Sequence, residues 1–274
     1  MKRIVRRQPA AGGYTNAERW RVEFADGTRG FVKRGVDADT SEWLRIEHRV
    51  YTAFADQPWL PRMLDFEDGE FATLILEDLG DAHWPPPWKS GHVDRVCAAL
   101  DQVHAQPIPD FVPEAGMDKY RGWHLVAADP EAFLGLGMVD ERWLEASLPR
   151  LLEAESELPD GPMSMVHLDT RSDNLCFDGD RTLIVDWNWV QRAPAGVDKA
   201  FWSVSLHHEG GPPPEQIVDP HCCWPARVSG FFASRAGLPV IPHAPRVRWI
   251  QQVQLRVALP WAVRALGLPS LALE

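Results

Sequence analysis

Two carboxylates and an amide stand at a spacing that suits metal-assisted chemistry. Asp169 is followed five residues later by Asn174, and Asp186 ends the next apolar run. Asp178-Gly179 lies between two short apolar segments and predicts a hairpin turn, which would bring Asn174 and Asp186 side by side. Mg2+ takes oxygen ligands and often needs only one or two protein groups. The spacing therefore predicts that Asn174 and Asp186 hold a divalent cation and that Asp169 is left for another task.

Coincidence is the competing explanation for this pattern. A short run such as His167-Leu168-Asp169 occurs by chance in many chains, and Asp173 and Asp180 have the character of ordinary turn residues. The complete pattern is longer: H-x-D-x-x-x-x-N, then hairpin spacing, then an aspartate at the end of a predicted strand. We therefore favour the functional interpretation.

The pattern resembles the catalytic loop and metal-binding aspartate of kinase-fold phosphotransferases, and most closely those of the aminoglycoside phosphotransferase family. His167, Asp169, Asn174 and Asp186 match that family's motif one by one. The resemblance implies a catalytic loop containing His167 and Asp169, in which Asp169 accepts a proton from a substrate hydroxyl. Trp187 follows Asp186 where protein kinases carry Phe-Gly, which argues against a protein kinase.

The same resemblance implies two supporting residues. Arg171 stands where protein kinases place the catalytic-loop lysine and would stabilise charge on the transferring phosphoryl group; an exposed loop arginine is the alternative. The segment Gly196-Val197-Asp198-Lys199-Ala200 resembles the family's G-x-x-D-x-A step, in which the aspartate braces the catalytic loop. A helix N-cap is the other interpretation of Asp198, and the two are compatible.

A glycine loop near the N-terminus precedes a predicted hairpin. Gly12-Gly13 stands before the alternating strand pattern of residues 20–24, which turns at Asp26-Gly27. Adjacent glycines let backbone amides approach a phosphate, and Thr15 and Asn16 add polar donors. A Gly-Gly pair alone indicates only a turn. The whole segment resembles the family's nucleotide loop, which implies that these four residues contact ATP or GTP.

Lys33 and Glu47 are predicted to form a buried ion pair. Lys33 ends the strand after the turn, and Glu47 falls on the apolar stripe of a helix expected over residues 41–54, with Thr40 or Ser41 as its cap. A carboxylate turned toward the core is costly unless it is paired. The resemblance identifies the pair with the kinase lysine and glutamate, so that Lys33 would hold the α and β phosphates. An exposed strand-end lysine is the alternative.

Two further strands, at 62–66 and 71–76, lead into the acidic segment Glu77-Asp78-Leu79-Gly80. This segment resembles the family's hinge between lobes, where backbone groups at Glu77 and Leu79 would contact the purine. The alternative is that the acidic side chains simply solvate the end of a strand.

The order of the predicted elements indicates an α+β protein with two lobes. Strands and one helix fill the first third, and helices dominate afterwards, at 92–105, 141–157, 201–208 and 247–265. The resemblance implies a protein-kinase-like fold with a small β-rich N-lobe at 1–79, which binds nucleotide, and a larger, mainly helical C-lobe at 80–274, which carries the catalytic loop and the substrate-binding helices.

Composition excludes several classes of partner. The chain has 274 residues and a formal net charge of -11, with its cations dispersed, so it is a poor non-specific binder of nucleic acid. No apolar run approaches the ~20 residues of a membrane span. The four cysteines form no C-x-x-C pattern. We expect a cytoplasmic protein with reduced thiols and no contact with nucleic acid or membranes; its oligomeric state is left open.

The resemblance implies a small-molecule kinase that uses Mg2+ and moves the γ-phosphoryl group of ATP or GTP to a hydroxyl. An aminoglycoside or another antibiotic fits the motif and the acidity, and would imply antibiotic resistance; a sugar, a ketosamine and an amino alcohol remain open as acceptors. A non-catalytic nucleotide-binding scaffold is an alternative of another class, against which the intact Lys33, Asp169, Asn174 and Asp186 speak.

Acceptor specificity is expected in the irregular segments 106–140 and 209–245, because loops vary while a scaffold stays. For a polycationic acceptor, Glu209, Glu215 and Asp219 are candidate partners. The alternative is that these three are solvated loop residues.

Overall fold

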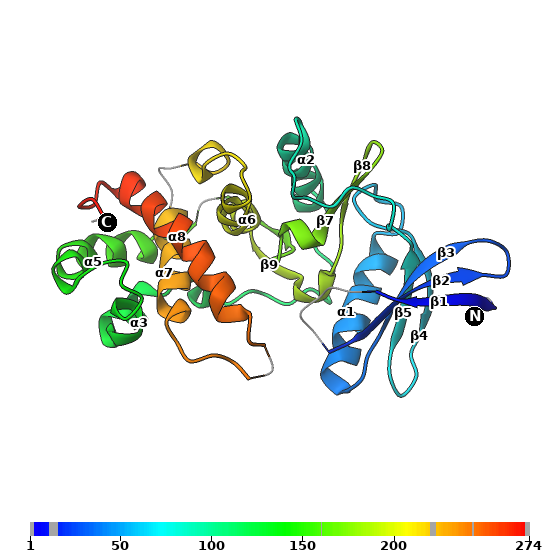
Figure 1. Cartoon of the computed structure of the whole chain (residues 1–274). Helices are drawn as coiled ribbons and strands as arrows, with labels where there is room; N and C mark the ends of the chain where they lie inside the picture. Colours follow the sequence, from blue (N-terminus) through cyan, green and yellow to red (C-terminus); the bar gives the residue numbers. More distant parts are fainter. Residues whose placement is uncertain (1–2, 11–15, 160, 220–222, 243, 272–274) are drawn as a thin grey trace. The chain divides into compact units, whose positions relative to one another are not determined.

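The protein has a mixed α+β fold in two compact units (Figure 1). The computed structural model describes residues 3–10, 16–159, 161–219, 223–242 and 244–271. Unit 1 comprises Met1–Pro113 and His167–Gln191, and unit 2 comprises Glu114–Val166 and Arg192–Glu274. These units and the expected lobes at 1–79 and 80–274 are different divisions of the chain, and the lobe boundary stays a prediction.

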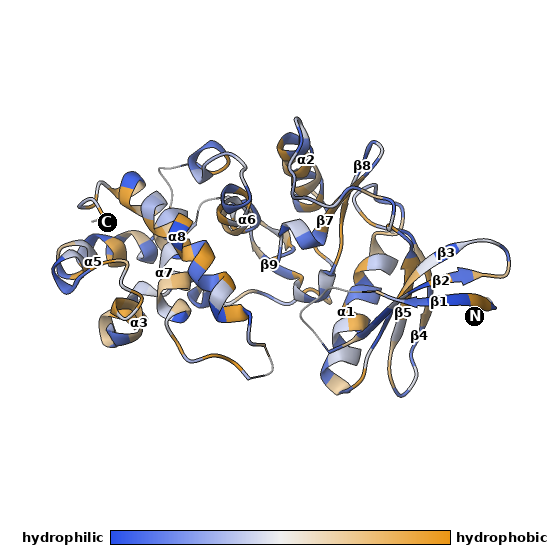
Figure 2. Ribbon diagram, viewed as in Figure 1, coloured by the Kyte–Doolittle hydropathy of each residue, from blue (hydrophilic) through white to orange (hydrophobic). Residues whose placement is uncertain are grey.

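A five-stranded antiparallel sheet forms the first part of unit 1, in the order β1-β2-β3-β5-β4. Its strands are β1 (Ile4–Pro9), β2 (Glu18–Phe24), β3 (Arg29–Arg34), β4 (Met63–Glu67) and β5 (Thr73–Glu77). Alternate side chains of β2 pack with Val32 and Ile75 to form a small core. The edge strand β1 is exposed throughout and mostly hydrophilic (Figure 2), which suits an unpaired edge.

The helix α1 (Ala38–Ala53) contacts this sheet along β3, β4 and β5. It begins after Asp37, whose carboxylate accepts a hydrogen bond from the Thr40 N–H at 2.8 Å, while Thr40 Oγ1 accepts one from the Asp37 N–H at 3.1 Å. The prediction that Thr40 or Ser41 is the cap is wrong, because Thr40 completes the capping box from inside the helix and Ser41 is buried. The predicted apolar stripe is confirmed, with Glu47 on it.

The second part of unit 1 contains the predicted hairpin. Its elements are α2 (His92–His104), η2 (Ser172–Asn174), β7 (Leu175–Asp178), β8 (Arg181–Ile184) and η3 (Trp187–Trp189). The register pairs Leu175 with Ile184, and Gly179 takes a positive φ of 56° at the turn. From α2, Arg95 donates to Thr182 Oγ1 at 3.1 Å and to the Gly179 carbonyl at 3.0 Å, which fixes the turn.

Unit 2 is mainly helical. Its elements are η1 (Met117–Tyr120), α3 (Trp123–Ala128), α4 (Glu131–Leu134), α5 (Glu141–Ser156), β6 (Met163–Val166), β9 (Gln191–Pro194), α6 (Gly196–His208), η4 (Pro214–Gln216), α7 (Trp224–Ala236) and α8 (Val247–Leu266). Segment 106–140, predicted to be irregular, contains three short helices. Across the described parts of the chain, no helix has the length and apolar character needed to cross a bilayer.

A buried carboxylate explains one of those short helices. Glu155 on α5 is fully buried and accepts hydrogen bonds from the N–H groups of Gly122, Trp123 and His124, each at 2.9 Å. It therefore caps the N-terminus of α3 from another helix, where the local sequence offers no capping side chain. Sequence patterns detect local caps, so this helix was not predicted.

We predict that Gly122→Ala destabilises the protein by about 3 kcal/mol, because the added methyl group would clash with backbone atoms that cannot easily move away. A Cβ at Gly122 would lie 1.8 Å from the carbonyl oxygen of Gly230 on α7. Urea unfolding gives the free energy. The matched control is Gly116→Ala, where the nearest atom is 3.7 Å away on the Lys119 side chain, and a change within about 0.5 kcal/mol is expected. Equal losses in the two variants would contradict the close approach of α3 and α7.

Candidate active site

Unit 1 contains all the predicted catalytic and metal-binding residues and the predicted lysine-glutamate pair. These are Lys33, Glu47, His167, Asp169, Arg171, Asn174 and Asp186. Lys33 comes from β3 and Glu47 from α1, whereas the others flank η2 and the β7–β8 hairpin. The geometry of the site is therefore described within one unit.

Lys33 lies between two carboxylates. Its Nζ donates a hydrogen bond to Glu47 Oε1 at 2.6 Å and another to Asp186 Oδ1. Lys33 is 5% exposed and Glu47 is 2% exposed, so the ion pair predicted from the apolar stripe forms in the protein interior. The alternative of an exposed strand-end lysine is excluded.

The two carboxylates share one ammonium and respond to it differently. Burial raises the pKa of Glu47 to about 7, because Lys33 offsets only part of the lost hydration and Asp186 adds a second negative charge. Burial also opposes ionisation of Asp186, but the Lys33 charge outweighs it and the pKa of Asp186 falls below its usual value. Asp186, whose side chain is 31% exposed, is therefore the persistent anion of the pair.

His167 connects the two halves of the site. It is fully buried, its Nε2 lies 2.8 Å from the Val185 carbonyl oxygen, and its Nδ1 accepts a hydrogen bond from the Asp169 N–H at 3.2 Å. This pairing defines a neutral ring with its proton on Nε2. The Trp187 ring packs against it edge-on, with centroids 4.6 Å apart. Because both ring nitrogens contact backbone, the geometry favours a positioning role for His167.

Asn174 orients the Asp169 side chain. Its Nδ2 donates to the Asp169 backbone carbonyl at 2.8 Å and to Asp169 Oδ2 at 3.0 Å, so the atom with which it would meet a cation is Oδ1. The Val185 N–H donates to the Asn174 carbonyl at 3.0 Å, which places Asn174 beside the strand end that leads to Asp186. The predicted hairpin is confirmed, and a cation site formed by Asn174 and Asp186 stays a prediction.

Arg171 is held by acidic neighbours. It donates to both carboxylate oxygens of Asp173, at 3.1 and 2.8 Å, and its Nε lies 3.5 Å from Asp169 Oδ1. Its side chain is 20% exposed, so the alternative of an exposed loop arginine does not describe it. Burial raises the pKa of Asp169, and the nearby Arg171 charge offsets part of this effect.

Two strained backbone positions flank the site. Leu168 has a φ of 65° and Asp186 a φ of 69°, and within the described ranges they are the non-glycine residues with positive φ. Each such position costs on the order of 1–3 kcal/mol and persists only where its surroundings hold it. Here the hydrogen bonds of His167 do so, because they hold the residue after Leu168 and the residue before Asp186.

Arg19 is a site residue that the sequence interpretation missed. It pairs with Lys33 across β2 and β3, so both side chains leave the same face of the sheet, and its charge helps to lower the pKa of Asp186. The hairpin register could have revealed it. The buried rings of Trp59 and Trp187, 5.0 Å apart, were also missed.

The proposed nucleotide contacts are only partly described. Gly12, Gly13 and Thr15 lie outside the described residues, and Asn16 is exposed. The Glu77 carboxylate accepts hydrogen bonds from Arg181 at 2.6 Å and from the Arg62 N–H at 2.9 Å. Its side chain is 11% exposed, so the alternative that this side chain simply solvates the end of a strand is wrong. The Glu77 N–H donates to the Arg62 carbonyl at 2.9 Å. Purine contacts at Glu77 and Leu79 stay predictions.

Two expectations concern unit 2. Asp198 is buried in the first turn of α6, but Ala195 is the N-cap, so the capping interpretation is wrong and bracing of the catalytic loop stays a prediction. Glu215 accepts hydrogen bonds from Arg264 at 2.8 and 3.2 Å, so its carboxylate has a structural partner, and recognition of a cationic acceptor by Glu209, Glu215 and Asp219 stays a prediction. No group of three or more His, Cys, Asp or Glu able to hold a metal occurs in the described ranges.

Comparison with known proteins gives a family match. A family model described as phosphotransferase enzyme family matches residues 6–216. No curated protein matches the chain.

Solved structures share the fold at low identity. The GDP complex of aminoglycoside 2'-phosphotransferase-IIIa is 13% identical with a TM-score of 0.62, over 96% of this chain and 93% of that one. An aminoglycoside phosphotransferase from Alicyclobacillus acidocaldarius is 12% identical with a TM-score of 0.60, over 96% and 91%. A choline/ethanolamine kinase family protein from Mesorhizobium loti is 13% identical with a TM-score of 0.60, over 96% and 91%. The expected fold class is confirmed.

We predict that Glu47→Gln changes the pH dependence of stability. The pKa of Glu47 is about 7 in the folded protein and 4.5 ordinarily, so between these values the folded protein binds the extra proton and stability falls as pH rises. Glutamine lacks this proton. The melting temperature of Glu47→Gln relative to wild type should therefore rise from pH 4.5 to 7 and level off above. Glu42→Gln, an exposed change on the same helix, should show no trend. A constant difference for Glu47→Gln would refute the raised pKa.

Proposed function

Because the chain belongs to the phosphotransferase enzyme family, we propose that it transfers the γ-phosphoryl group of ATP or GTP to a hydroxyl of a small molecule. The observation that carries this proposal is the assembly, within one unit, of Asp169, Asn174 and Asp186 with a buried Lys33–Glu47 pair. A phosphoryl-transfer site needs positioning and charge stabilisation rather than covalent catalysis, and this set provides both.

Asp169 is the proposed proton acceptor. The acceptor hydroxyl gives its proton to the Asp169 carboxylate as its oxygen forms a bond to the γ-phosphorus, and the bond to the bridging oxygen of the nucleoside diphosphate breaks. Burial raises the pKa of Asp169, which makes the carboxylate a better base. Asn174 and His167 support this role, since Asn174 holds the carboxylate and His167 holds the backbone N–H of Asp169.

The residues fit a magnesium ion. Asp186 has a lowered pKa and would contribute a full negative charge, and the amide Oδ1 of Asn174 would add a neutral oxygen. Such a site relies on phosphate oxygens and waters for its other ligands, as Mg2+ sites commonly do. When bound, the ion would neutralise charge on the phosphates of the nucleotide.

Lys33 is proposed to steady the phosphates that are not transferred. An ammonium has three N–H donors, and two of them are directed at Glu47 and Asp186. The third would serve a phosphate oxygen, with Glu47 fixing the direction of the side chain. The GDP complex of an aminoglycoside 2'-phosphotransferase with the same fold supports a nucleotide as co-substrate.

The acceptor class is the open part of the proposal. Solved structures of the same fold include a kanamycin complex of an aminoglycoside phosphotransferase and a choline/ethanolamine kinase family protein, which support an antibiotic and an amino alcohol respectively. A role in antibiotic resistance holds only for the first. The presence of Lys33, Asp169, Asn174 and Asp186 favours catalysis over a nucleotide-binding scaffold. We place the reaction in the cytoplasm, where nucleoside triphosphates are abundant.

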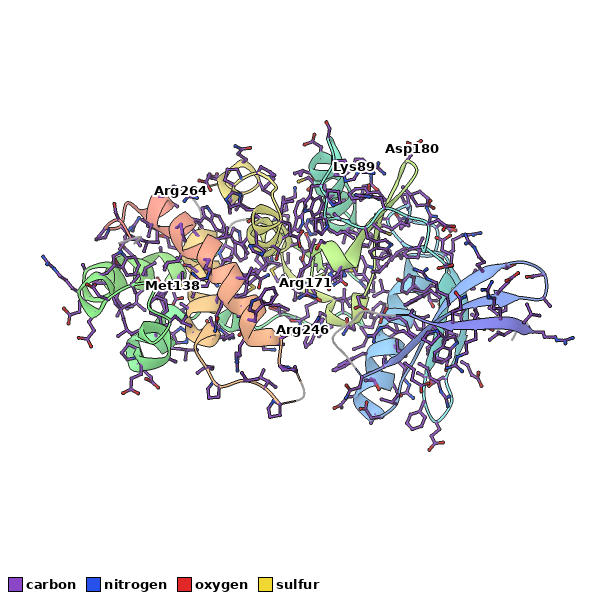
Figure 3. All side chains as sticks on the ribbon, in the orientation of Figure 1. Lys89, Met138, Arg171, Asp180, Arg246 and Arg264 are labelled. Atoms are coloured by element: carbon purple, nitrogen blue, oxygen red, sulfur yellow. The ribbon has the colours of Figure 1, made fainter. Side chains whose placement is uncertain are left out.

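Asp169→Asn should reduce phosphoryl transfer by about 10³-fold, because it removes the proton acceptor. The affinity for the nucleotide should change little, since Asp169 is not a proposed cation ligand. Production of nucleoside diphosphate with an acceptor, and calorimetric titration with MgATP, measure the two effects. Asp180→Asn is the control, an exposed turn position labelled in Figure 3, and should match wild type. Transfer by Asp169→Asn at a rate near wild type would exclude Asp169 as the base.

Asp186→Asn should weaken Mg2+-dependent binding of ATP more than Asn174→Ala does, by on the order of tenfold, because an anionic ligand contributes more than a neutral one. Asparagine is chosen because it keeps the side-chain shape and tolerates the positive φ of this position. ATP titrations with and without Mg2+ distinguish two causes. Loss of the cation site weakens only the Mg2+-dependent binding, whereas loss of the fold weakens binding under both conditions. Equal, small losses in both variants would remove Asp186 from the metal site.

A further inference from the structure

The pairing of β2 with β3 places two positive charges directly opposite each other. These strands lie side by side in Figure 1, and three positions of their antiparallel register pair charged residues. Two of these pairs combine opposite charges; they are Glu18 with Arg34 and Glu23 with Arg29. The third pairs Arg19 with Lys33. Because like charges opposite each other destabilise a sheet, this pair needs an anion close to it.

Arg19 lies on the face of the sheet that carries the candidate site. Residues paired in register point to the same face, with their Cβ atoms about 5 Å apart. On that face the Lys33 ammonium contacts Glu47 and Asp186. The half-buried Arg19 side chain is anchored at the start of β2, where Nη1 donates to the Ala17 carbonyl at 2.9 Å. All five residues belong to unit 1.

Two carboxylates supply negative charge near this pair, but both have other demands on them. Asp186 is the proposed cation ligand, so its charge would be shared with Mg2+ when a nucleotide binds. Burial raises the pKa of Glu47 to about 7, so its carboxylate is partly protonated near neutral pH. Positive charge from Lys33 and Arg19 therefore exceeds the negative charge left to offset it. A further anion between the two cations would restore the balance.

We propose that Arg19 binds the phosphate chain of the nucleotide together with Lys33. A guanidinium presents several N–H donors in a planar fork and can contact two phosphate oxygens at once. Lys33 has one donor left after its bonds to Glu47 and Asp186. The inference rests on the proposed phosphotransferase function and adds a binding residue to it. Arg19 thus provides phosphate contacts that Lys33, held by two carboxylates, can provide only in part.

A purely structural role is the competing explanation for Arg19. Burial is the largest influence on the pKa of both Glu47 and Asp186, the Lys33 charge is the next, and the Arg19 charge adds to the lowering. As a structural counter-charge, Arg19 would support the binding of every nucleoside ligand alike. As a phosphate ligand, it would support only those ligands that carry a phosphate chain. A comparison of ligands therefore separates the two roles.

Arg19→Gln tests the phosphate contact. Calorimetric titration of the full chain with adenosine, ADP and ATP in the presence of Mg2+ gives the three Kd values, and the guanosine series is titrated in parallel. In the series that the wild type binds, we expect Arg19→Gln to raise the Kd of the diphosphate and triphosphate about tenfold, because a charge-assisted contact is lost. The Kd of the nucleoside should stay within about twofold of wild type.

Two further variants control the interpretation. Arg34→Gln makes the same charge change at the next residue after Lys33, where the exposed side chain leaves the opposite face of β3, and should leave every Kd unchanged. Arg19→Lys keeps the charge without the planar fork and should raise the Kd of ATP about threefold, which tests the contact should Arg19→Gln fail to fold. Wild-type affinity for ATP in both Arg19 variants, an equal loss for the nucleoside, or an equal effect of Arg34→Gln overturns the proposal.

Inorganic tripolyphosphate separates the Arg19 contact from the proposed reaction. It has a phosphate chain without a purine, so its binding requires neither a nucleoside contact nor an acceptor. With Mg2+ present, it should bind the wild type, more weakly to Arg19→Gln and equally to Arg34→Gln. If Arg19→Gln leaves the affinity for both tripolyphosphate and nucleotide intact, the role of Arg19 fails while the phosphotransferase function stands. If the wild type binds neither nucleotides nor tripolyphosphate, both proposals fail.

Discussion

The placement of Lys33 between Glu47 and Asp186 is the interaction on which the candidate site depends. A buried ammonium requires a counter-charge, and two carboxylates compete for this one. Burial raises the pKa of Glu47, whereas the Lys33 charge holds the pKa of Asp186 below its usual value, so Asp186 keeps the charge that a cation site needs. The two ion pairs of Lys33 also join α1 and β3 to Asp186, at the strand end after the hairpin. A structural link within unit 1 thus also sets the electrostatics of its site.

Strain at Leu168 and Asp186 is the second constraint, and the hydrogen bonds of His167 hold it. An unstrained backbone would turn the Asp169 side chain or the Asp186 carboxylate elsewhere, because a change in φ of this size redirects the side chain. The ring of His167 is fixed on one side by Val185, on the other by the Asp169 N–H, and packs on Trp187. These contacts favour a positioning role for His167, because they hold the backbone next to two acidic residues.

The sequence predicts those parts of the structure that follow from local periodicity. The hairpin around Gly179, the apolar stripe of α1 and the inward position of Glu47 are confirmed because alternation and helical spacing determine them directly. The cap at Asp37, the α3 helix capped by Glu155 and the strained φ of Leu168 were not predicted, since each depends on a partner distant in sequence or on a choice between adjacent polar residues. Arg19 was missed because a register, not a motif, brings it beside Lys33.

Net charge alone does not predict the charge of the acceptor, for a physical reason. Charges on a protein surface act over a Debye length of ~8 Å at physiological ionic strength, so a ligand responds to the few groups nearest to it rather than to the total. The acidic residues that make the chain anionic lie before residue 220, apart from the final Glu274, and Glu215 among them is paired with Arg264. Residues 220–273 contain six arginines and no Asp or Glu, so the charge that a ligand meets depends on which part of the chain it contacts.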